Sequence, residues 1–325
     1  LVVSEVDNRR ALLADWLQTE TSFKDGQLSI ASADASFRRY FRLKHNGKSY
    51  IVMDAPPELE PSLPFVQIGQ WMKKSGINVP KIYQHDLQLG FMILSDFGNF
   101  HFQDALITKD RESIYKLATD EIIQFQSSLH DSKKILPAFT PEWQVKELEI
   151  FREWCLPDIT QMEYREITSP LVSAINRIPK SFMHRDFHCR NLLLYADQKL
   201  GVIDFQGAMH GPITYDLVSL LRDCYVDNEE EWIDHSVLAF QQNLIARGIG
   251  DAHVSPDEFI RWFDLTGLQR HLKCIGIFHR LQIRDQKPNY MKDVPRVLAY
   301  IKNALKRQSD LGELKNLTEK ATILE

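Results

Sequence analysis

Cysteine is scarce in this sequence of 325 residues, and its cysteines lie far apart. The four of them are Cys155, Cys189, Cys224 and Cys274, and no two form a C-x-x-C pair. This spacing argues against both a disulfide framework and a zinc site built on thiolates. We therefore expect four reduced thiols.

The sequence also lacks an excess of positive charge and long hydrophobic runs. Its 39 Lys and Arg residues are outnumbered by 44 Asp and Glu residues, which gives a formal net charge of −5. Because this balance provides no basic field to neutralise phosphates, we expect no nucleic-acid partner. The apolar runs are far shorter than the roughly 18 residues that cross a bilayer, so we expect no membrane-spanning helix.

The first residues show no secretion signal, which would place an apolar stretch after a basic start. Instead, the sequence turns charged at Glu5, Asp7, Arg9 and Arg10. We therefore expect a cytoplasmic protein. The content of 44% hydrophobic and 26% charged residues is that of a globular chain and excludes disorder for most of its length.

Residues 1–96 are predicted to form a small, mostly antiparallel sheet. An Asn46-Gly47 turn joins two runs with strand character, which together predict a β-hairpin. The expected strands are 36–44, 49–53, 80–83 and 91–95, and the expected helices are 11–18 and 65–74.

Residues 97–325 are predicted to be mainly helical. Helical spacing of apolar residues covers 110–129, 141–154, 170–177, 229–247, 256–281 and 294–306. Three short strands are expected in the middle of this region, at 181–183, 191–195 and 200–203. The polar tail after Leu311 is expected to fray. A sheet region followed by a helical region predicts an α+β fold.

The embedded strands bracket the residues that indicate chemistry. Asp186 is followed five positions later by Asn191 and then by Asp204-Phe205, which is the order and spacing of a kinase catalytic loop and its metal-binding aspartate. In phosphoryl transfer, one carboxylate accepts the proton of the attacking hydroxyl. An amide oxygen and a second carboxylate hold Mg²⁺ against the nucleotide phosphates. We predict Asp186 as the base, Asn191 and Asp204 as Mg²⁺ ligands, and ATP as the co-substrate.

Two other interpretations of this motif are open. Asp and Asn are common in turns, so the three polar residues could simply cap loops beside short strands. His184 and His188 have the i, i+4 spacing of a metal pair on a helix, although residues 191–194 predict a strand there.

The order His184-x-Asp186-x-His188-x-x-Asn191, with Ile203-Asp204-Phe205 downstream, resembles the aminoglycoside phosphotransferase and choline kinase family. The segment 211–217 resembles the family's P-x-x-D-L motif, which implies that Asp216 is a structural brace at the start of a helix beneath the loop. The resemblance implies a two-lobed protein-kinase-like fold. Its N-lobe (1–96) would bind the nucleotide, and its larger, mainly helical C-lobe (97–325) would carry the catalytic loop and bind the acceptor.

Within this family, the segments 32–42, 184–191 and 204–206 are most similar to bacterial cell-wall-recycling kinases, which phosphorylate the anomeric hydroxyl of N-acetylmuramate and N-acetylglucosamine. The similarity covers most of the chain and implies a monomeric, ATP-dependent small-molecule kinase. His188, which matches the family's loop, and Arg190, which could neutralise the phosphates from the same loop, join Asp186 among the predicted catalytic residues. An aminoglycoside antibiotic kinase is an alternative, favoured by the acidic residues between Asp223 and Glu231. A catalytically inactive nucleotide-binding regulator is another.

The lysine that usually lies over the ATP phosphates is missing from 50–54, and the glycine-rich loop is missing from 31–36. Arg38, Arg39 and Arg42 on the preceding strand are the predicted substitutes, because a guanidinium can bind phosphate in a bidentate manner. Strand alternation predicts Arg38 and Arg42 on one face and Arg39 on the other. The same arginines could instead be solvated ion-pair partners on an exposed face.

Two further segments are expected to contact the nucleotide. The small residues up to Ser36 would let backbone amides approach the phosphates. Leu94, Ser95 and Asp96, where a strand leaves the sheet, are expected to contact adenine. For the acceptor, the candidates are Tyr215, Arg222, Arg270 and Lys273, whose cations could meet a sugar carboxylate, although cations on helices more often face solvent.

Overall fold

We describe the protein from a computed structural model that covers residues 2–33, 37–196, 199–249 and 253–321. The chain forms two compact units. The first consists of Leu1–Phe100 and Leu193–Gln206, and the second consists of His101–Leu192 and Gly207–Glu325. The boundary predicted at 96 lies close to the end of the first of these segments. The roles of the two parts in nucleotide and acceptor binding stay predictions.

The first unit is built on a five-stranded antiparallel sheet with the order β1-β2-β3-β5-β4. Its strands are β1 (Gln27–Ala33), β2 (Arg39–His45), β3 (Lys48–Asp54), β4 (Ile82–Asp86) and β5 (Phe91–Ser95). Asn46 and Gly47 have φ angles of 49° and 71°, the left-handed pair that a two-residue type I′ turn requires. The predicted hairpin is therefore confirmed, whereas β1 was not predicted as a separate strand.

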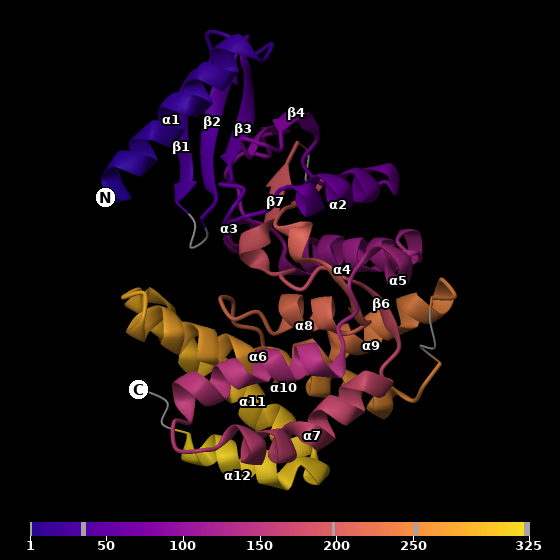
Figure 1. Ribbon diagram of the computed structural model, residues 1–325. Coiled ribbons are helices and arrows are strands. Elements are labelled where there is room, and N and C mark those ends of the chain that lie inside the picture. Colours follow the sequence, from indigo (N-terminus) through magenta and orange to yellow (C-terminus); the bar gives the residue numbers. More distant parts are fainter. Residues whose placement is uncertain (1, 34–36, 197–198, 250–252, 322–325) are drawn as a thin grey trace. The chain divides into compact units, whose positions relative to one another are not determined.

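Helix α1 (Val2–Thr19) lies along one face of this sheet (Figure 1). Its Leu13, Trp16 and Leu17 share a buried apolar cluster with the strand residues Phe41, Leu43, Val52, Phe91 and Ile93. Because side chains alternate along a strand, Arg39 points to the face that α1 covers and Arg42 points to the opposite face. The predicted separation of these two arginines is confirmed.

Helix α2 (Leu63–Lys74) and the hairpin of β7 (Leu192–Tyr195) and β8 (Lys199–Val202) complete the first unit. The side chain of Asn78 donates a hydrogen bond of 2.6 Å to the Leu200 carbonyl. On α2, Gly69 lies directly against the ring of Phe205, and a Cβ at Gly69 would be 3.0 Å from that ring. The two strands predicted near 191–195 and 200–203 are confirmed.

The second unit is mainly helical, and the predicted fold class is confirmed. Its helices are α3 (Phe102–Thr108), α4 (Arg111–Ser128), α5 (Ser132–Ile135), α6 (Pro141–Cys155), α7 (Gln161–Arg177), α8 (Tyr215–Leu221), α9 (Glu230–Ala246), α10 (Pro256–Ile283), α11 (Val294–Arg307) and α12 (Gly312–Lys320). Two short strands, β6 (Lys180–Met183) and β9 (Met209–Pro212), pair antiparallel within it. In the part of the chain that the structure describes, no helix combines the length and the apolar character that crossing a membrane requires.

Helix α10 is buried over most of its length and organises the second unit (Figure 1). A Cβ at Gly276 would lie 2.6 Å from the backbone nitrogen of Phe151, so α10 and α6 pack with their backbones in close approach. The polar residues of α10 between Gln269 and Lys273 are consequently held in the interior.

Two predictions for the second unit were wrong. Helix α7 begins at Gln161 and not at Pro170, because Thr160 caps it by accepting the Glu163 backbone N–H and because the proline is accommodated inside the helix. The tail expected to fray forms α12, whose Leu314 and Leu317 are buried. Helix α3 and strand β9 are short, and no periodic pattern marked them.

Candidate active site

The predicted catalytic loop begins directly after β6. Asp216, near the start of α8, accepts hydrogen bonds from the backbone N–H groups of His184 (2.7 Å) and Arg185 (3.0 Å). Arg185 has a φ of 78°, a left-handed conformation that a residue other than glycine adopts only where its surroundings hold it. The buried carboxyl group of Asp216 holds Arg185 in this conformation. The predicted role of Asp216 as a structural brace is confirmed.

A second buried carboxylate anchors the middle of the loop. Asp223, which follows α8, accepts the backbone N–H of Cys189 at 2.7 Å through Oδ2 and that of Tyr225 at 2.8 Å through Oδ1. Asp223 is only 1% exposed. Asp216 and Asp223, at the two ends of one short helix, therefore fix the loop at two points through hydrogen bonds from its backbone.

Asp186 is half-buried among positive charges. Burial alone would raise the pKa of its carboxyl group, but the charges of Lys273 and Arg185 outweigh this effect and lower the pKa to about 2. Asp186 is consequently ionised at neutral pH. A carboxylate in this state can accept the hydrogen bond and the proton of an attacking hydroxyl.

Asn191 is oriented by the main chain of the same loop. Its side-chain Nδ2 donates a hydrogen bond of 2.9 Å to the Asp186 carbonyl, and its backbone N–H donates one of 2.9 Å to the His188 carbonyl. Because the amide nitrogen points to the Asp186 carbonyl, the amide oxygen Oδ1 points away from it. An amide oxygen is the atom that a kinase asparagine offers to Mg²⁺. The ligand role of Asn191 stays a prediction.

His188 and Arg190 lie in the same loop. The Nδ1 atom of His188 is buried and has no hydrogen-bond partner among the residues that the structure describes. Burial and the charges of Arg270 and Arg190 lower the pKa of His188, so its ring is neutral at pH 7. The guanidinium of Arg190 lies 3.4 Å from the centre of the Tyr225 ring. Neither observation tests their predicted catalytic roles.

Asp204 belongs to the first unit, where it follows β8. It adopts a left-handed φ of 64°, and Gln206 donates a hydrogen bond of 2.6 Å to its Oδ1. The next residue, Phe205, is fully buried, with its ring 4.8 Å from that of Phe65 on α2. The phenylalanine of the Asp-Phe pair therefore anchors the turn that presents Asp204.

Each of the three candidate arginines of the first unit has a different carboxylate partner. The pairs are Arg38–Glu60 at 2.8 Å, Arg39 Nε–Asp54 at 2.9 Å and Arg42 Nε–Asp96 at 2.7 Å. Asp54 is completely buried and also binds Arg9 of α1, so Arg39 belongs to an ion cluster on the α1 face of the sheet. Arg38 and Arg39 thus have different partners. Because Arg38 precedes β2, its place on the same face as Arg42 stays a prediction.

Arg42 ties β2 to the segment that leaves β5, because it also donates to the side chain of Asn99 at 2.7 Å. Burial raises the pKa of Asp96, but hydrogen bonds from Arg42 and Ser49 outweigh this and lower it, so Asp96 is ionised. The backbone N–H of Ser95 donates to the Lys81 carbonyl at 2.9 Å. Leu94 is buried within β5. Contacts of Leu94, Ser95 and Asp96 with adenine stay predictions, and Ser36 lies outside the described residues.

Lys273, a predicted acceptor residue, contacts both the buried Glu147 and Tyr215, a second predicted acceptor residue. The Nζ atom of Lys273 lies 3.5 Å from Glu147 Oε1 and donates a hydrogen bond of 3.3 Å to the Tyr215 hydroxyl. Glu147 also pairs with Arg185 at 2.6 Å. Burial raises the pKa of Glu147, but Lys273 and Arg185 outweigh this and lower it. Sequence reasoning missed Glu147, because nothing in the α6 pattern sets it apart from other glutamates.

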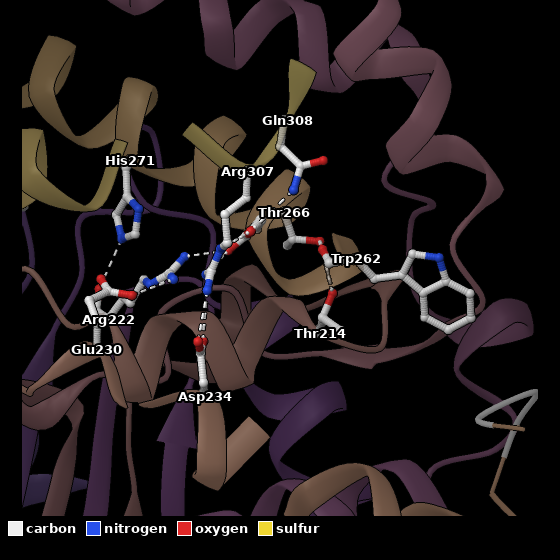
Figure 2. A network of polar contacts seen from close by, with 10 residues as sticks. Thr214, Arg222, Glu230, Asp234, Trp262, Thr266, His271, Arg307 and Gln308 are labelled. Atoms are coloured by element: carbon white, nitrogen blue, oxygen red, sulfur yellow. Dashed lines mark hydrogen bonds and ion pairs between the residues drawn. The ribbon is translucent and has the colours of Figure 1, made fainter. Parts of the chain in front are cut away.

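Arg222 is fully buried in a network of charged side chains, which Figure 2 shows. Its Nη1 lies 2.9 Å from Asp264 and its Nη2 lies 2.8 Å from Glu230. Arg307 binds the same Asp264 at 2.7 Å. The charge of Arg222 is therefore matched by protein carboxylates, and these contacts favour a structural role. Its predicted role in acceptor binding is untested.

The structure bears on two of the alternatives that the sequence left open. Among the described residues, no three His, Cys, Asp or Glu side chains are placed to hold a metal ion together, so the pair His184 and His188 gains no third ligand there. Of the acidic residues that favoured an antibiotic-binding cleft, Asp223 holds the catalytic loop and Glu230 pairs with Arg222. Asp223 and Glu230 therefore have structural roles.

The chain belongs to the phosphotransferase enzyme family, which it matches over residues 27–248. It is accordingly an ATP-dependent small-molecule kinase. The chain is 36% identical to a protein named N-acetylmuramate/N-acetylglucosamine kinase from Neisseria meningitidis serogroup B, over 94% of both chains. It is 38% identical to a protein of the same name from Pseudomonas aeruginosa, over 90% of this chain and 87% of the relative.

Solved structures show the same fold at low sequence identity. A choline/ethanolamine kinase family protein from Mesorhizobium loti matches with a TM-score of 0.62 and 13% identity, over 94% of this chain and 98% of its own. An aminoglycoside phosphotransferase homologue from Ralstonia eutropha matches with a TM-score of 0.61 and 13% identity, over 96% and 99% of the two chains. The kinase-like fold implied by the sequence resemblance is confirmed.

Proposed function

We propose that this kinase transfers the γ-phosphoryl group of ATP to the anomeric hydroxyl of an amino sugar, N-acetylmuramate or N-acetylglucosamine, in cell-wall recycling. The observation that carries the proposal is the ionised Asp186 in a loop that also orients Asn191 through its main chain. The names of the two relatives, which match this chain over 90% or more of its length, support the acceptor.

In the proposed reaction, Asp186 accepts a hydrogen bond from the anomeric hydroxyl and takes its proton as transfer proceeds. The hydroxyl oxygen forms a bond to the γ-phosphorus, the bond from that phosphorus to the β,γ-bridging oxygen breaks, and ADP leaves. The low pKa of Asp186 keeps its carboxylate available over the whole neutral range. Its main contribution is to align the attacking hydroxyl.

Asn191 and Asp204 keep the roles of Mg²⁺ ligands that the sequence predicts. The donor set fits this ion, because Asn191 directs its amide nitrogen to the Asp186 carbonyl and keeps an oxygen as the ligand atom. Asp204 contributes a carboxylate on a turn that Gln206 and Phe205 hold. When bound, Mg²⁺ neutralises charge on the phosphates of ATP.

Arg38 is the proposed substitute for the missing strand lysine. In protein kinases the phosphate-binding lysine pairs with a glutamate of a helix, and Arg38 pairs with Glu60, shortly before α2, at 2.8 Å. Arg39 shares the buried Asp54 with Arg9 on the α1 face, which makes it the weaker candidate. For the remaining contacts with the nucleotide, the segment from Leu94 to Asp96 is proposed for adenine.

Tyr215, Lys273 and Arg270 are the proposed acceptor-binding residues. All three belong to the second unit, and the charges of Lys273 and Arg270 act on Asp186. Arg222 is left out of this site, because both of its terminal nitrogens already bind carboxylates. The expected partners are ATP and the amino sugar, and the monomeric state and cytoplasmic location stay predictions.

An acceptor panel assayed with Mg²⁺ and ATP tests the proposal. The panel contains N-acetylmuramate, N-acetylglucosamine, kanamycin and choline, and phosphorus NMR identifies the phosphorylated position. We expect turnover with the two amino sugars and an anomeric phosphate. The methyl glycoside of N-acetylglucosamine is the matched control, because its anomeric oxygen is blocked. Turnover with kanamycin or choline alone would overturn the proposal, and binding of ATP without any turnover would favour the regulator.

A further inference from the structure

The buried cations of the second unit differ in how their charge is matched. Three of them lie close to carboxylates, in the pairs Arg185–Glu147 at 2.6 Å, Lys273–Glu147 at 3.5 Å and Arg222–Asp264 at 2.9 Å. Arg270 is 3% exposed, and within the described part of the chain no carboxylate oxygen lies within 4.0 Å of its guanidinium. Its Nη1 donates instead to the sulfur of Cys224 at 3.5 Å.

A buried cation without a counter-ion is unfavourable, because it has lost the stabilisation by water and has gained none from a carboxylate. A thiol sulfur is a weak hydrogen-bond acceptor, so the guanidinium of Arg270 has no direct carboxylate partner. Burial lowers the pKa of Arg270, but the charges of Cys274, Cys224 and Asp223 outweigh this effect and raise it, so Arg270 stays charged. The guanidinium is also the group that best fits a carboxylate, since its planar fork can donate two parallel hydrogen bonds. The guanidinium of Arg270 is therefore suited to bind an anion.

Arg270 lies near the catalytic loop of its own unit. It donates to Cys224, and the neighbouring Asp223 accepts the backbone N–H of Cys189 in that loop. Its charge also lowers the pKa of Asp186 and of His188. In the proposed function, Asp186 contacts the hydroxyl that is phosphorylated. An anion that reaches Arg270 can thus be part of the same acceptor molecule.

We propose that Arg270 binds the carboxylate of an acidic amino sugar and thereby makes the kinase prefer this acceptor to a neutral one. This inference rests on the proposed function. The two sugars in the name of the relatives differ in the required way, because N-acetylmuramate carries a carboxylate on its lactyl ether, where N-acetylglucosamine has a hydroxyl. The neutral sugar offers no carboxylate to the guanidinium of Arg270.

Acceptor selectivity of Arg270→Gln tests the inference. We measure kcat/KM for N-acetylmuramate, its lactyl methyl ester and N-acetylglucosamine with the wild type and the variant. Loss of a charge-assisted contact should reduce kcat/KM for N-acetylmuramate by about 10- to 100-fold. The values for the two neutral acceptors should fall far less. Equal losses for all three acceptors would overturn the inference, because Arg270 would then serve the phosphoryl group or the fold.

Thermal unfolding separates this role from a structural one. Arg270→Met should lower the melting temperature of the free protein less than Arg222→Met does, since it leaves no carboxylate without a direct partner, and it should abolish the extra stabilisation by N-acetylmuramate over its ester. Arg222→Met is the matched control and should lower the melting temperature, because it leaves the buried Asp264 short of a partner. An equal decrease for both variants would overturn the inference.

Failure of the inference and failure of the proposed function are distinguishable. If the wild type phosphorylates neither amino sugar, the proposed function is wrong, and so is the role of Arg270 that depends on it. If the wild type phosphorylates both and Arg270→Gln keeps their ratio, only the role of Arg270 is lost. Should Arg270→Gln fail to fold, the same comparison is made with Arg270→Met, which also removes the charge. An unchanged ratio there also overturns the inference.

Discussion

The side chain of Asn191 donates a hydrogen bond to the backbone carbonyl of Asp186, with 2.9 Å between nitrogen and oxygen. This bond joins the proposed metal ligand to the main chain of the proposed base and does not involve the Asp186 carboxylate. The side chain of Asp186 can consequently be changed without breaking the contact that orients Asn191.

We expect Asp186→Asn to keep the fold and the affinity for ATP but to lose turnover by about 10²- to 10⁴-fold, because the amide cannot accept the proton of the attacking hydroxyl. Calorimetric titration with ATP and Mg²⁺ measures the affinity, and a coupled ADP assay measures the rate. Turnover like that of the wild type would remove Asp186 from its role. A large loss of ATP affinity would show that the variant disturbs the loop.

Asp216→Asn should change how stability depends on pH. Burial raises the pKa of Asp216 to about 7 in the native state, against roughly 4 for an exposed aspartate. The native state therefore keeps a proton that the unfolded state releases between these values. The resulting contribution to the free energy of unfolding is complete below about pH 4 and is lost as the pH rises through about 7.

Asparagine at this position does not titrate but still offers one acceptor oxygen to the loop. The stability advantage of the wild type over Asp216→Asn should accordingly shrink as the pH rises, which urea midpoints at about pH 5 and about pH 8 would measure. Using the difference between the two proteins cancels the titration of His188 and of the other shared groups. A difference that is independent of pH would contradict the raised pKa of Asp216.

Arg38→Met should weaken binding of ATP by roughly 10- to 100-fold, because a charge-assisted contact to the phosphates is lost. Arg39→Met is the matched control, because Arg39 pairs with Asp54 on the α1 face of the sheet. It should keep the ATP affinity and lower the free energy of unfolding by about 1 to 3 kcal/mol, because the buried Asp54 loses one of its two arginines. ATP titration and urea unfolding measure the two effects. Equal losses of ATP affinity would mean that the two arginines do not divide these roles.

Gly69→Ala should disturb the turn that carries Asp204. The added methyl group would lie 3.0 Å from the ring of Phe205, which must then shift at a cost of about 1 to 3 kcal/mol in stability. Since Asp204 directly precedes Phe205, the Mg²⁺-dependent binding of ATP should also weaken. Gly312→Ala on α12 is the control, because nothing lies within 4 Å of its Cβ position and the change should be neutral or stabilising by up to about 1 kcal/mol. If Gly69→Ala binds ATP as the wild type does, Phe205 does not position Asp204.

The features that could be predicted from the sequence are those that depend on short spacing. The Asn46-Gly47 turn is a local conformational requirement, and the order of Asp186, Asn191 and Asp204 reflects the geometry of phosphoryl transfer. Asp216 was recognisable as a brace because it lies in a motif at a fixed position relative to the loop.

The carboxylates that complete these sites could not be predicted. Glu60, Glu147 and Asp223 meet their partners only through tertiary packing, and no local pattern distinguishes them from solvated acidic residues. The burial of Arg222 could not be predicted either, because a single arginine in a sequence suggests a solvent-facing cation. Here α9 and α10 each supply a carboxylate that lets it be fully buried. The internal Pro170 of α7 is a further case in which packing overrides a local preference.

The first unit is discontinuous in sequence, and this has a consequence for how such enzymes can be recombined. A gene fragment ending at Phe100 would lack Leu193–Gln206, and with it the carbonyl that Asn78 binds and the ring that covers Phe65 and Gly69. Exchanging this unit between two relatives therefore requires three simultaneous crossovers, after residues 100, 192 and 206. The stretch from Gly207 onwards, which contains Arg270 and Lys273, can be exchanged with one. Evolution can accordingly vary the proposed acceptor residues by single recombination events while the first unit stays intact.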